Sequence, residues 1–600
     1  ALLLVLDNSE HLIADIARVV DAIVKQCPNV NVLATSREPL GTTGEVVYRL
    51  LSLDDASALQ LFTERARSVN DRFEITATNR TTVAQICSHL GGIALAIELA
   101  AARVRSISVD ELSRRLQLRV LGSGREPLAR HQTMHALIDW SYDLLTPVEQ
   151  RIFMQLSPFV GGVSLETAMA TYCCDDLDDL ELLDLVTSLV DKSLLVADVG
   201  ETTQRYRFLE PIREYARERL EKSGDAGDTL VRYARTFADF ADAAYEEFDT
   251  GPKDDWLERS QCELDNVRAA MRWALEHCEE TPAARIAGGF GVVFLRLTLL
   301  QEGIDWDNRV LAKGAELPPA IEARLQYVLS MLNNNQGHFA ASLSAARHAL
   351  VRYRAAGDQR GIVRALSQVA QQLENTGQSG EALVTAGEAI EAARLLDDPA
   401  LLAAVLGRCA NALVSDHIET ARSHYCEASQ LLEGLGRDAE CSRILYWWAD
   451  AEYREGNFPR AAALIEEALP KAQPDVKISA ILTATAIYWA LDDRARAEPS
   501  TRTALDLARG AGDSIYTTWA LSWGAMLGLE SDPDDATRLF GYAERQRKNF
   551  EWTSDAFERS AWGNAQSALR DKLGADRYDT LLAEGAAWNQ DTAFSVASGF

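Results

Sequence analysis

An internal repeat in the second half of the chain places the strongest constraint on how that half can fold. Six turn residues recur at intervals of 36 to 40 residues. A small residue follows each turn by five positions, and an alanine follows each turn by twelve. Small residues at fixed offsets let two antiparallel helices approach closely, so the spacing predicts a solenoid of stacked helix pairs. The turn residues are Gly337, Gly377, Asp416, Gly456, Asp492 and Ser531, and the small residues are Ser342, Ala382, Ala421, Ala461, Ala497 and Ala536, then Ala349, Ala389, Ala428, Ala468, Ala504 and Ala543.

The helix pairs follow the packing pattern of tetratricopeptide repeats, slightly longer than their common form of about 34 residues. We expect them to fill residues 225–600 and to offer a concave surface to a protein or peptide partner. Aromatic residues fall on the first helices of the later repeats, where core packing is more common than a binding role. They are Tyr446, Trp447, Trp448, Tyr453, Tyr488, Trp489, Trp519 and Trp523.

Composition and charge exclude several classes of protein. The 600 residues include 89 acidic and 60 basic side chains, and the formal net charge of -29 repels nucleic acid and anionic lipid. The nine cysteines show no CxxC or Cys/His ligand spacing, so we expect neither a zinc site nor a disulfide framework. Free thiols indicate a cytoplasmic protein. No apolar run is long enough to cross a membrane, and we expect no membrane partner.

The first fifty residues predict one strand, helix, strand unit. Leu2 to Leu6 form an aliphatic run typical of a parallel strand covered on both faces, and Asp7 follows it. Residues 12–24 have helical periodicity, and a second apolar run ends just before Arg37. A right-handed βαβ unit places Asp7 and Arg37 at the same sheet edge, which suits a magnesium-nucleotide site. Alternatively, Asp7 caps the helix and Arg37 forms a surface ion pair.

The segments LLLVLDNSEHL and VLATSREPLG resemble the Walker B and sensor segments of STAND signalling ATPases. The resemblance is to the NB-ARC-like branch of that family, found in bacterial AfsR- and LuxR-type regulators. The resemblance implies ATP or ADP with Mg²⁺ as cofactors, Asp7 as the magnesium carboxylate and Arg37 as the sensor arginine. Asn8 replaces the second acid of many relatives, which leaves Glu10 as the candidate general base. We expect at most a slow regulatory ATPase in the complete protein, and no activity from this chain alone.

A glycine-rich phosphate-binding loop is the part of such an ATPase that the sequence lacks. No GxxxxGK[ST] motif occurs anywhere in the 600 residues. Backbone N–H groups and the lysine of that loop normally hold the nucleotide phosphates. We therefore expect residues 1–52 to be the second half of a P-loop domain, either in a fragment of a longer protein or in a descendant that lost the loop.

Residues 53–125 predict a small helical domain. The segment Gly92 to Ala96 resembles the GLPLA motif of the same family, with Ala94 in place of the proline that lies against the nucleotide. The resemblance implies that Gly92 and Ala94 contact the cofactor. Without it, Gly91 and Gly92 would mark a loop before a tightly packed helix.

Residues 126–224 predict a winged helix. Several amphipathic helices precede two β-branched segments, 193–199 and 204–209, and a closing helix follows. The segments WSYDLL and LEPIREYA resemble the winged helix of this family, which serves as an intramolecular regulatory clamp more than as a DNA-binding domain. Arg213, Arg217 and Arg219 give the closing helix a basic side, but glutamates interleave with them, so we expect a salt-bridged face.

Taken together, these segments predict a mostly α-helical chain: an α/β remnant of a P-loop domain, a small helical domain, a winged helix and a tetratricopeptide-like solenoid. By resemblance, ADP would hold a closed state, and ATP with a signal sensed by the repeats would open it. Self-association could accompany activation, and DNA would be contacted only through a domain outside this chain. The alternative is a protein-interaction scaffold that works without nucleotide.

Overall fold

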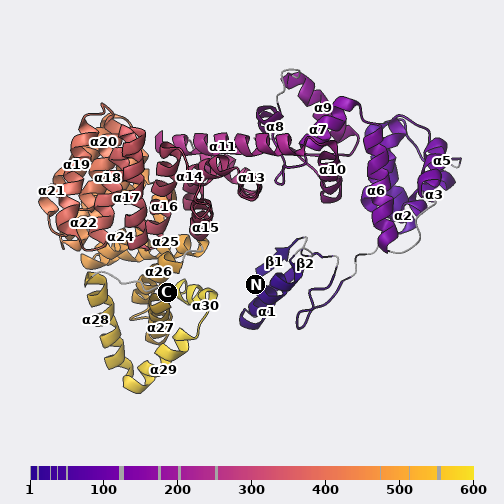
Figure 1. Ribbon diagram of the computed structural model, residues 1–600. Helices are drawn as coiled ribbons and strands as arrows, with labels where there is room; N and C mark the ends of the chain where they lie inside the picture. The colour runs from indigo at the N-terminus through magenta and orange to yellow at the C-terminus, as the bar shows by residue number, and fades with distance from the viewer. Residues whose placement is uncertain are drawn as a thin grey trace. The chain divides into compact units, whose positions relative to one another are not determined.

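The protein is described by a computed structural model (Figure 1), which forms two compact units. The first unit contains residues 1–157, 162–169 and 173–224, and the second contains 158–161, 170–172 and 225–600. The structure describes residues 2–7, 9, 12–27, 29–36, 38–48, 50, 52–76, 78–120, 127–172, 178–199, 204–250, 255–472, 474–511, 514–549 and 556–600.

The first unit begins with the predicted βαβ element. Its two strands pair in parallel, with Leu2 opposite Val30 at one end of the ladder. Helix α1 covers one side of the sheet and buries Val20. The expectation that the first strand is covered on both faces is wrong for this structure, because Leu3 and Val5 are more than half exposed on a sheet with one helix against it. The elements are β1 (Leu2–Leu6), α1 (Ile13–Gln26) and β2 (Val30–Ala34).

A helical domain follows, and its core gathers apolar side chains from every helix. Phe62, Ile97 and Leu112 are buried there, and the next helix adds Leu137 and Trp140 to the same core. Burial of such side chains is the main source of the domain's stability. The elements are α2 (Asp55–Val69), α3 (Arg80–His89), α4 (Ala94–Ala101), the 3₁₀ helix η2 (Ala102–Arg105), α5 (Val109–Val120) and α6 (Pro127–Asp143).

The winged helix has the predicted order of helices and strands. Strands β3 and β4 pair in antiparallel fashion, and an isolated bridge from Val163 to Tyr206 extends the ribbon. The two β-branched segments of the sequence therefore form the wing. The elements are α7 (Pro147–Gln155), α8 (Leu165–Tyr172), α9 (Asp179–Asp191), β3 (Val196–Val199), β4 (Gln204–Arg207) and α10 (Glu210–Ser223).

The second unit begins with five helices that lead into the repeats. Glycines allow α14 to approach its neighbours closely: a Cβ atom on Gly289 would lie 2.5 Å from the carbonyl oxygen of Ala241, and one on Gly288 would lie 3.0 Å from Leu325. Any larger residue would push these helices apart. The elements are α11 (Ala226–Thr250), α12 (Trp256–Cys262), α13 (Leu264–Glu276), α14 (Glu280–Arg296) and α15 (Leu300–Leu311).

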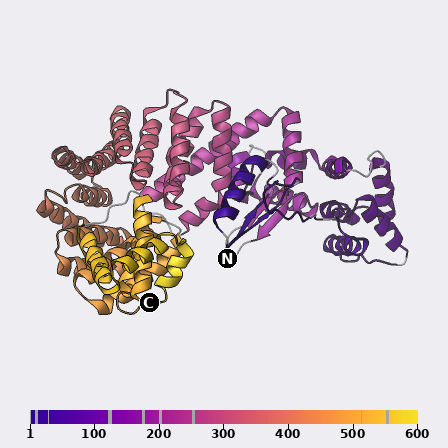
Figure 2. The same ribbon diagram turned by 90° about the horizontal axis from the view of Figure 1, so that it is seen from below.

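Six helix pairs then follow one another in a curved row within the second unit (Figure 2). The pairs are α16 (Pro319–Asn335) and α17 (Phe339–Ala356), α18 (Gln359–Asn375) and α19 (Ser379–Arg394), α20 (Pro399–Asn411) and α21 (Ile418–Gly434), α22 (Asp438–Arg454) and α23 (Phe458–Ala468), α24 (Pro474–Ala490) and α25 (Arg494–Ala511), and α26 (Ser514–Leu527) and α27 (Pro533–Asn549). A short 3₁₀ helix, η3 (Leu469–Lys471), follows α23, and α28 (Ala556–Leu573), α29 (Ala575–Ala586) and α30 (Gln590–Ala597) complete the row.

The small residues of the sequence repeat lie where the helices touch. Each of the twelve positions named from the spacing has 0% exposed surface. Three of the turn residues, Gly337, Gly377 and Gly456, adopt positive φ angles of 79°, 75° and 78°, a backbone region that glycine enters without strain. Five of the eight aromatic residues are buried and the other three are partly buried, as the core interpretation predicts. The solenoid predicted from the repeat is therefore confirmed.

The predicted fold class is confirmed: the described chain is mostly helical, with one small parallel element, one winged helix and a long helical solenoid. Among the described residues, no helix combines the length and apolar character needed to cross a membrane. The seven cysteines that the structure describes are free thiols. The adjacent pair Cys173 and Cys174 lies outside the described residues.

A buried carboxyl group without a partner generates a prediction about stability. Asp307 on α15 is 1% exposed, neither of its carboxyl oxygens has a hydrogen-bond partner, and burial raises its pKa well above the ordinary value. The folded state therefore favours the protonated form, and stability falls as the pH rises above about 4, where the unfolded chain ionises. We expect Asp307→Asn to raise stability at neutral pH by about 1–3 kcal/mol.

Thermal unfolding at several pH values measures this effect. The exposed Asp305 on the same helix supplies the control Asp305→Asn, which should change the melting temperature little. A loss of stability at neutral pH in Asp307→Asn, with no change in its pH dependence, would contradict the prediction.

Candidate functional site

Asp7 lies at the carboxyl end of β1 and is held by the neighbouring strand. The Thr35 hydroxyl donates a hydrogen bond to the Asp7 carboxylate, and the backbone N–H of Ser9 donates to the carbonyl oxygen of Thr35 at 2.9 Å. The residue that precedes α1 is Leu12, so Asp7 does not cap that helix. The helix-cap alternative for Asp7 is therefore wrong, and Asp7 joins the ends of the two strands.

The strand ends bring together part of the predicted site. The Asp7 side chain is exposed, and a carboxylate beside a hydroxyl offers the oxygen ligands that Mg²⁺ prefers. Sequence reasoning missed Thr35, although its place at the end of the adjacent parallel strand could have revealed it. Arg37 and Glu10 lie outside the described residues. Within the described ranges, no group of three or more His, Cys, Asp or Glu side chains could hold a metal ion.

Gly92 has a structural role in the helical domain. It adopts a φ of 66°, and its carbonyl oxygen accepts a hydrogen bond of 2.9 Å from the backbone N–H of Leu53. A Cβ atom here would lie 2.4 Å from the Leu53 carbonyl oxygen, so only glycine fits. Ala94 begins α4 and is exposed. The loop interpretation accounts for Gly92, and contact of either residue with a cofactor stays a prediction.

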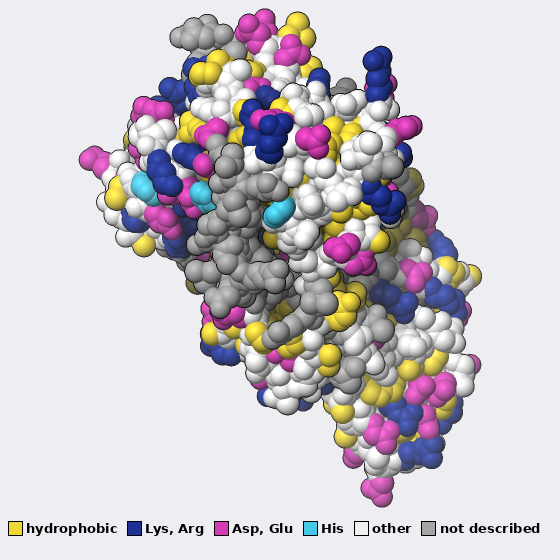
Figure 3. Space-filling view, turned by 90° about the vertical axis from the view of Figure 1, so that its right-hand side faces the viewer, with side chains coloured by type: hydrophobic (Ala, Val, Ile, Leu, Met, Phe, Trp, Pro, Cys, Tyr) yellow, Lys and Arg dark blue, Asp and Glu magenta, His cyan; other side chains and the backbone are white. Residues whose placement is uncertain are grey.

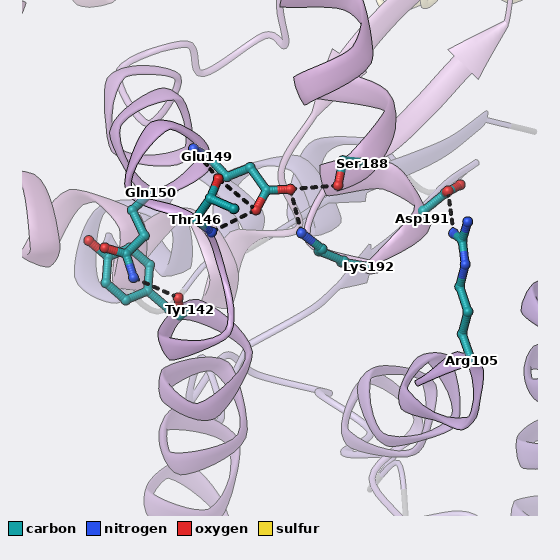
Figure 4. Close-up of polar contacts among 8 residues, drawn as sticks. All are labelled: Arg105, Tyr142, Thr146, Glu149, Gln150, Ser188, Asp191 and Lys192. Atoms are coloured by element: carbon teal, nitrogen blue, oxygen red, sulfur yellow. Dashed lines mark hydrogen bonds and ion pairs between the residues drawn. The ribbon is translucent and has the colours of Figure 1, made fainter. Parts of the chain in front are cut away.

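Glu149 is the centre of a polar network that joins two helices of the winged helix (Figure 4). Its carboxylate accepts hydrogen bonds from the Thr146 backbone N–H at 2.8 Å and the Ser188 hydroxyl at 2.6 Å, and forms an ion pair with Lys192. The Glu149 N–H donates to the Thr146 hydroxyl, which completes a capping box at the start of α7. The same carboxylate therefore caps α7 and ties it to the end of α9.

The network keeps the buried Glu149 ionised. Burial by itself would raise the pKa of this carboxyl, because its side chain is 7% exposed. Hydrogen bonds from Lys192, Ser188 and the Thr146 backbone outweigh burial and lower the pKa to about 2. Sequence reasoning missed this site. The Thr146-Pro-Val-Glu149 pattern is a capping-box signal, but nothing local in the sequence identifies Lys192 as the partner.

The end of α9 also contacts the helical domain. Arg105 of η2 forms an ion pair of 2.6 Å with Asp191, the residue next to Lys192 (Figure 4). Both side chains are about half exposed, so salt screens this contact far more than the buried Glu149 pair. The last turn of α9 thus connects α7 on one side with η2 on the other.

Helix α9 is the helix that precedes the wing. In a winged helix that reads DNA, the helix at this position presents basic and polar side chains to the groove. Here its exposed side chains include Asp179, Glu181, Asp184 and Asp191, and α9 contains no lysine or arginine. Residues 145–221 contain 15 acidic and seven basic residues. The electrostatics of this face repel the DNA phosphate backbone.

The basic residues of the winged helix are mostly bound by partners within the unit. On α10, Arg213 pairs with Glu210 at 2.8 Å and Arg217 with Glu221 at 3.2 Å, as the interleaved sequence predicts. Arg219 differs from the prediction, because it pairs with Asp139 of α6. On the described surface of the molecule in Figure 3, basic and acidic side chains are interspersed. The remaining contacts are Lys192 with Glu149, Arg207 with Asp198, and Arg205 with the Gly162 carbonyl oxygen.

Comparison with known proteins agrees with the winged helix. The family described as winged helix-turn-helix domain matches residues 145–221. A protein of Mycobacterium bovis, provisionally named an HTH-type transcriptional regulator, is 35% identical over 489 residues, which cover 79% of this chain and 54% of that protein. An uncharacterized protein of Mycobacterium tuberculosis is 38% identical over 239 residues, covering 39% of this chain and 61% of that protein. The chain thus spans about half the length of the regulators that it matches.

Solved structures show only a distant likeness. A STAND protein with a tetratricopeptide repeat sensor from Pyrococcus horikoshii aligns with 97% of this chain and 83% of its own length, at 14% identity and a TM-score of 0.45. The apo form of the quorum sensor NprR from B. thuringiensis aligns with 59% of this chain and 98% of its own length, at 14% identity and a TM-score of 0.35. These scores establish neither a shared fold nor a shared function.

The Glu149 network generates a prediction with a defined pH dependence. Because its folded-state pKa is depressed, Glu149 stabilises the fold above the unfolded pKa of about 4, and this stability is lost as the pH falls toward 2. We expect Glu149→Gln to destabilise the winged helix by about 3 kcal/mol near neutral pH, because Lys192 loses its buried partner. Hydrogen exchange of α7 and α9 amides should rise accordingly.

The control is Glu166→Gln, which changes an exposed glutamate in the first turn of α8. It should leave exchange in α7 and α9 unchanged. Equal exchange in wild type and Glu149→Gln, at pH values both above and below 4, would contradict a structural role for the network.

Proposed function

We propose that this chain is the switch and sensor portion of a transcriptional regulator, in the NB-ARC-like branch of STAND signalling ATPases that includes AfsR- and LuxR-type proteins. The 35% identity over 489 residues to a protein provisionally named an HTH-type regulator supports a regulatory role. The chain covers 54% of that protein, so the output of the complete protein belongs to this proposal and not to the comparison. The motifs around Asp7 and Gly92 support the finer assignment.

The observation that carries the proposal is the charge of the winged helix. Its α9 is acidic, and its arginines other than Arg151 are held by carboxylates or carbonyl oxygens, which leaves little free positive charge for DNA. The same helix ends in contacts with both α7 and η2. We infer that this winged helix transmits conformational change between domains, and that DNA is contacted by a domain outside this chain.

The nucleotide part of the proposal rests on the strand-end pair. Asp7 would hold Mg²⁺ through water beside the Thr35 hydroxyl, and ADP or ATP bound with that ion would set the closed or open state. Arg37 would sense the terminal phosphate and Glu10 would serve as base in a slow regulatory hydrolysis. Gly92 and Ala94 would face the nucleotide from the helical domain.

The repeats form the sensor in this proposal. A solenoid of helix pairs exposes a long inner surface that suits a protein or peptide ligand. Binding of that ligand would shift the chain toward the open state, and self-association of open molecules would follow. The alternative, an interaction scaffold that ignores nucleotide, keeps the same sensor but gives Asp7 no role.

Thermal unfolding with Mg-ADP tests where the nucleotide phosphates bind in this proposal. A nucleotide at a thousandfold its Kd adds about 4 kcal/mol of stability, but most of that energy comes from the P-loop, which the 600 residues lack. We therefore expect Mg-ADP to leave the melting temperature of this chain nearly unchanged. A shift of several degrees would contradict our account of where the phosphates bind.

In the complete protein, Asp7→Asn should change the transcriptional response to the activating signal. The matched control is Asp15→Asn, which alters an exposed aspartate of α1 whose ion pair within the described residues is with Arg18 on the same helix. A response that is the same in wild type and both variants would favour the nucleotide-independent scaffold.

A further inference from the structure

Ion pairs between arginine and glutamate connect the second helices of successive repeats. Each arginine reaches a glutamate on the second helix of the next pair, about one repeat further along the chain. These exposed contacts fix the register between neighbours, although each contributes little to stability. They are Arg347 with Glu381 at 2.9 Å, Arg354 with Glu388 at 2.8 Å and Arg394 with Glu427 at 2.8 Å.

Arg408 on the first helix α20 departs from this pattern. Its Nη1 donates hydrogen bonds to the Tyr327 hydroxyl at 3.1 Å and the Ser367 hydroxyl at 3.3 Å. Those partners lie on α16 and α18, the first helices of the two preceding pairs. Among the described residues, no carboxylate lies within ion-pair distance of Arg408. Its partners are therefore neutral.

The Arg408 to Tyr327 hydrogen bond identifies the inner side of the curve. Helix α18 packs against both α16 and α20. Adjacent helix axes are about 8–10 Å apart, so α16 and α20 would be roughly twice that distance apart in a flat row. Two long side chains bridge such a gap most readily where the row bends toward them. Arg408 and Tyr327 therefore lie on the side toward which the first helices bend, which is the concave side of the solenoid.

The guanidinium of Arg408 is held in place with one edge open. Both described hydrogen bonds use Nη1, whereas Nε and Nη2 make none and are not sealed from water. The Nε and Nη2 edge is a pair of parallel donors that fits a carboxylate in bidentate fashion. Tyr327 and Ser367 are buried and Arg408 is partly exposed, so the two hydroxyls orient the arginine toward the concave surface.

The electrostatic surroundings also favour an anion at this position. The pKa of Arg408 lies above its ordinary value: burial lowers it and so does the neighbouring cation Arg364, but the Tyr327 hydroxyl and the Cys409 thiol raise it by more, and no carboxylate is among these groups. An acidic ligand would therefore meet positive charge here, although the chain as a whole carries a net charge of -29.

Amide side chains continue the same face toward the ends of the first helices. Asn334 follows Tyr327 by two helical turns, and its carbonyl oxygen accepts from Gln372 at 2.9 Å and Asn375 at 3.3 Å. Amides can hydrogen-bond the backbone of an extended chain without a charge of their own. A peptide lying across α16, α18 and α20 would meet these amide groups and the guanidinium that Tyr327 and Ser367 hold in place.

We propose that Arg408, oriented by Tyr327 and Ser367, is the anchor for a carboxylate of a peptide bound to the concave surface of the repeats. This rests on the sensor role proposed above and specifies its ligand as an acidic peptide segment. The arginine supplies the bidentate contact, and the two hydroxyls reduce the entropy lost when the contact forms.

Calorimetric titration of the 600-residue chain with hexaglutamate at low ionic strength tests the assignment. Wild type should bind hexaglutamate and should not bind an uncharged hexapeptide of serine.

Arg408→Gln should weaken binding at least about tenfold. Arg408→Lys keeps the positive charge but loses the pair of parallel N–H donors, so it should also weaken binding of hexaglutamate. Tyr327→Phe, which frees the guanidinium, should have a smaller effect. The matched control Arg394→Gln removes an arginine from the second-helix ladder and should leave binding unchanged.

The proposal would be overturned if wild type did not bind hexaglutamate, or if wild type and Arg408→Gln bound it equally while showing the same melting temperature. It would also be overturned if inorganic phosphate displaced hexaglutamate and acetate did not. The last would identify a phosphate site instead. Neither nucleotide nor DNA is present in this titration. Loss of binding in Arg408→Gln together with a silent Asp7→Asn would therefore support the anchor while contradicting the nucleotide switch.

Discussion

Close contact between helices at small residues is the constraint on which the solenoid depends. The alanines at two fixed positions in successive repeats have no exposed surface, and glycines let α14 approach α11 and α16 to within contact of their backbones. Because interiors are packed as tightly as crystals, a larger side chain at any of these points would displace a whole helix. The hydrogen bond from Arg408 to Tyr327 spans three first helices of this closely packed row.

The first unit is organised by charge as well as by burial. Helix α9 is tied to α7 through the buried Glu149 and Lys192 pair and to η2 through the exposed Arg105 and Asp191 pair. Breaking a buried pair costs several kcal/mol, whereas an exposed pair costs little and responds to salt. One end of α9 therefore has a buried contact and an exposed, salt-sensitive contact side by side.

Patterns that repeat locally could be read from the sequence, and contacts between distant residues could not. The alanine spacing, the two strands of the wing and the βαβ unit depend on neighbours within one or two elements, and all are confirmed. The partner of Glu149 lies 43 residues away and that of Arg408 lies 81 residues away. Such pairs depend on how helices pack and on how far the row curves, which no local propensity encodes. The sequence places Asp7 and Thr35 at the ends of neighbouring strands, and the parallel register of the structure shows that the two side chains are in contact.

Fluorescence anisotropy of labelled duplex DNA with the 600-residue chain tests most directly whether the winged helix connects domains without reading DNA. At physiological salt we expect no saturable binding, because α9 is acidic and the arginines of α10 are paired. Arg151 is the basic residue of this domain with no described partner. Saturable binding that weakens with salt and falls in Arg151→Ala would contradict the claim and make this winged helix a DNA-binding domain.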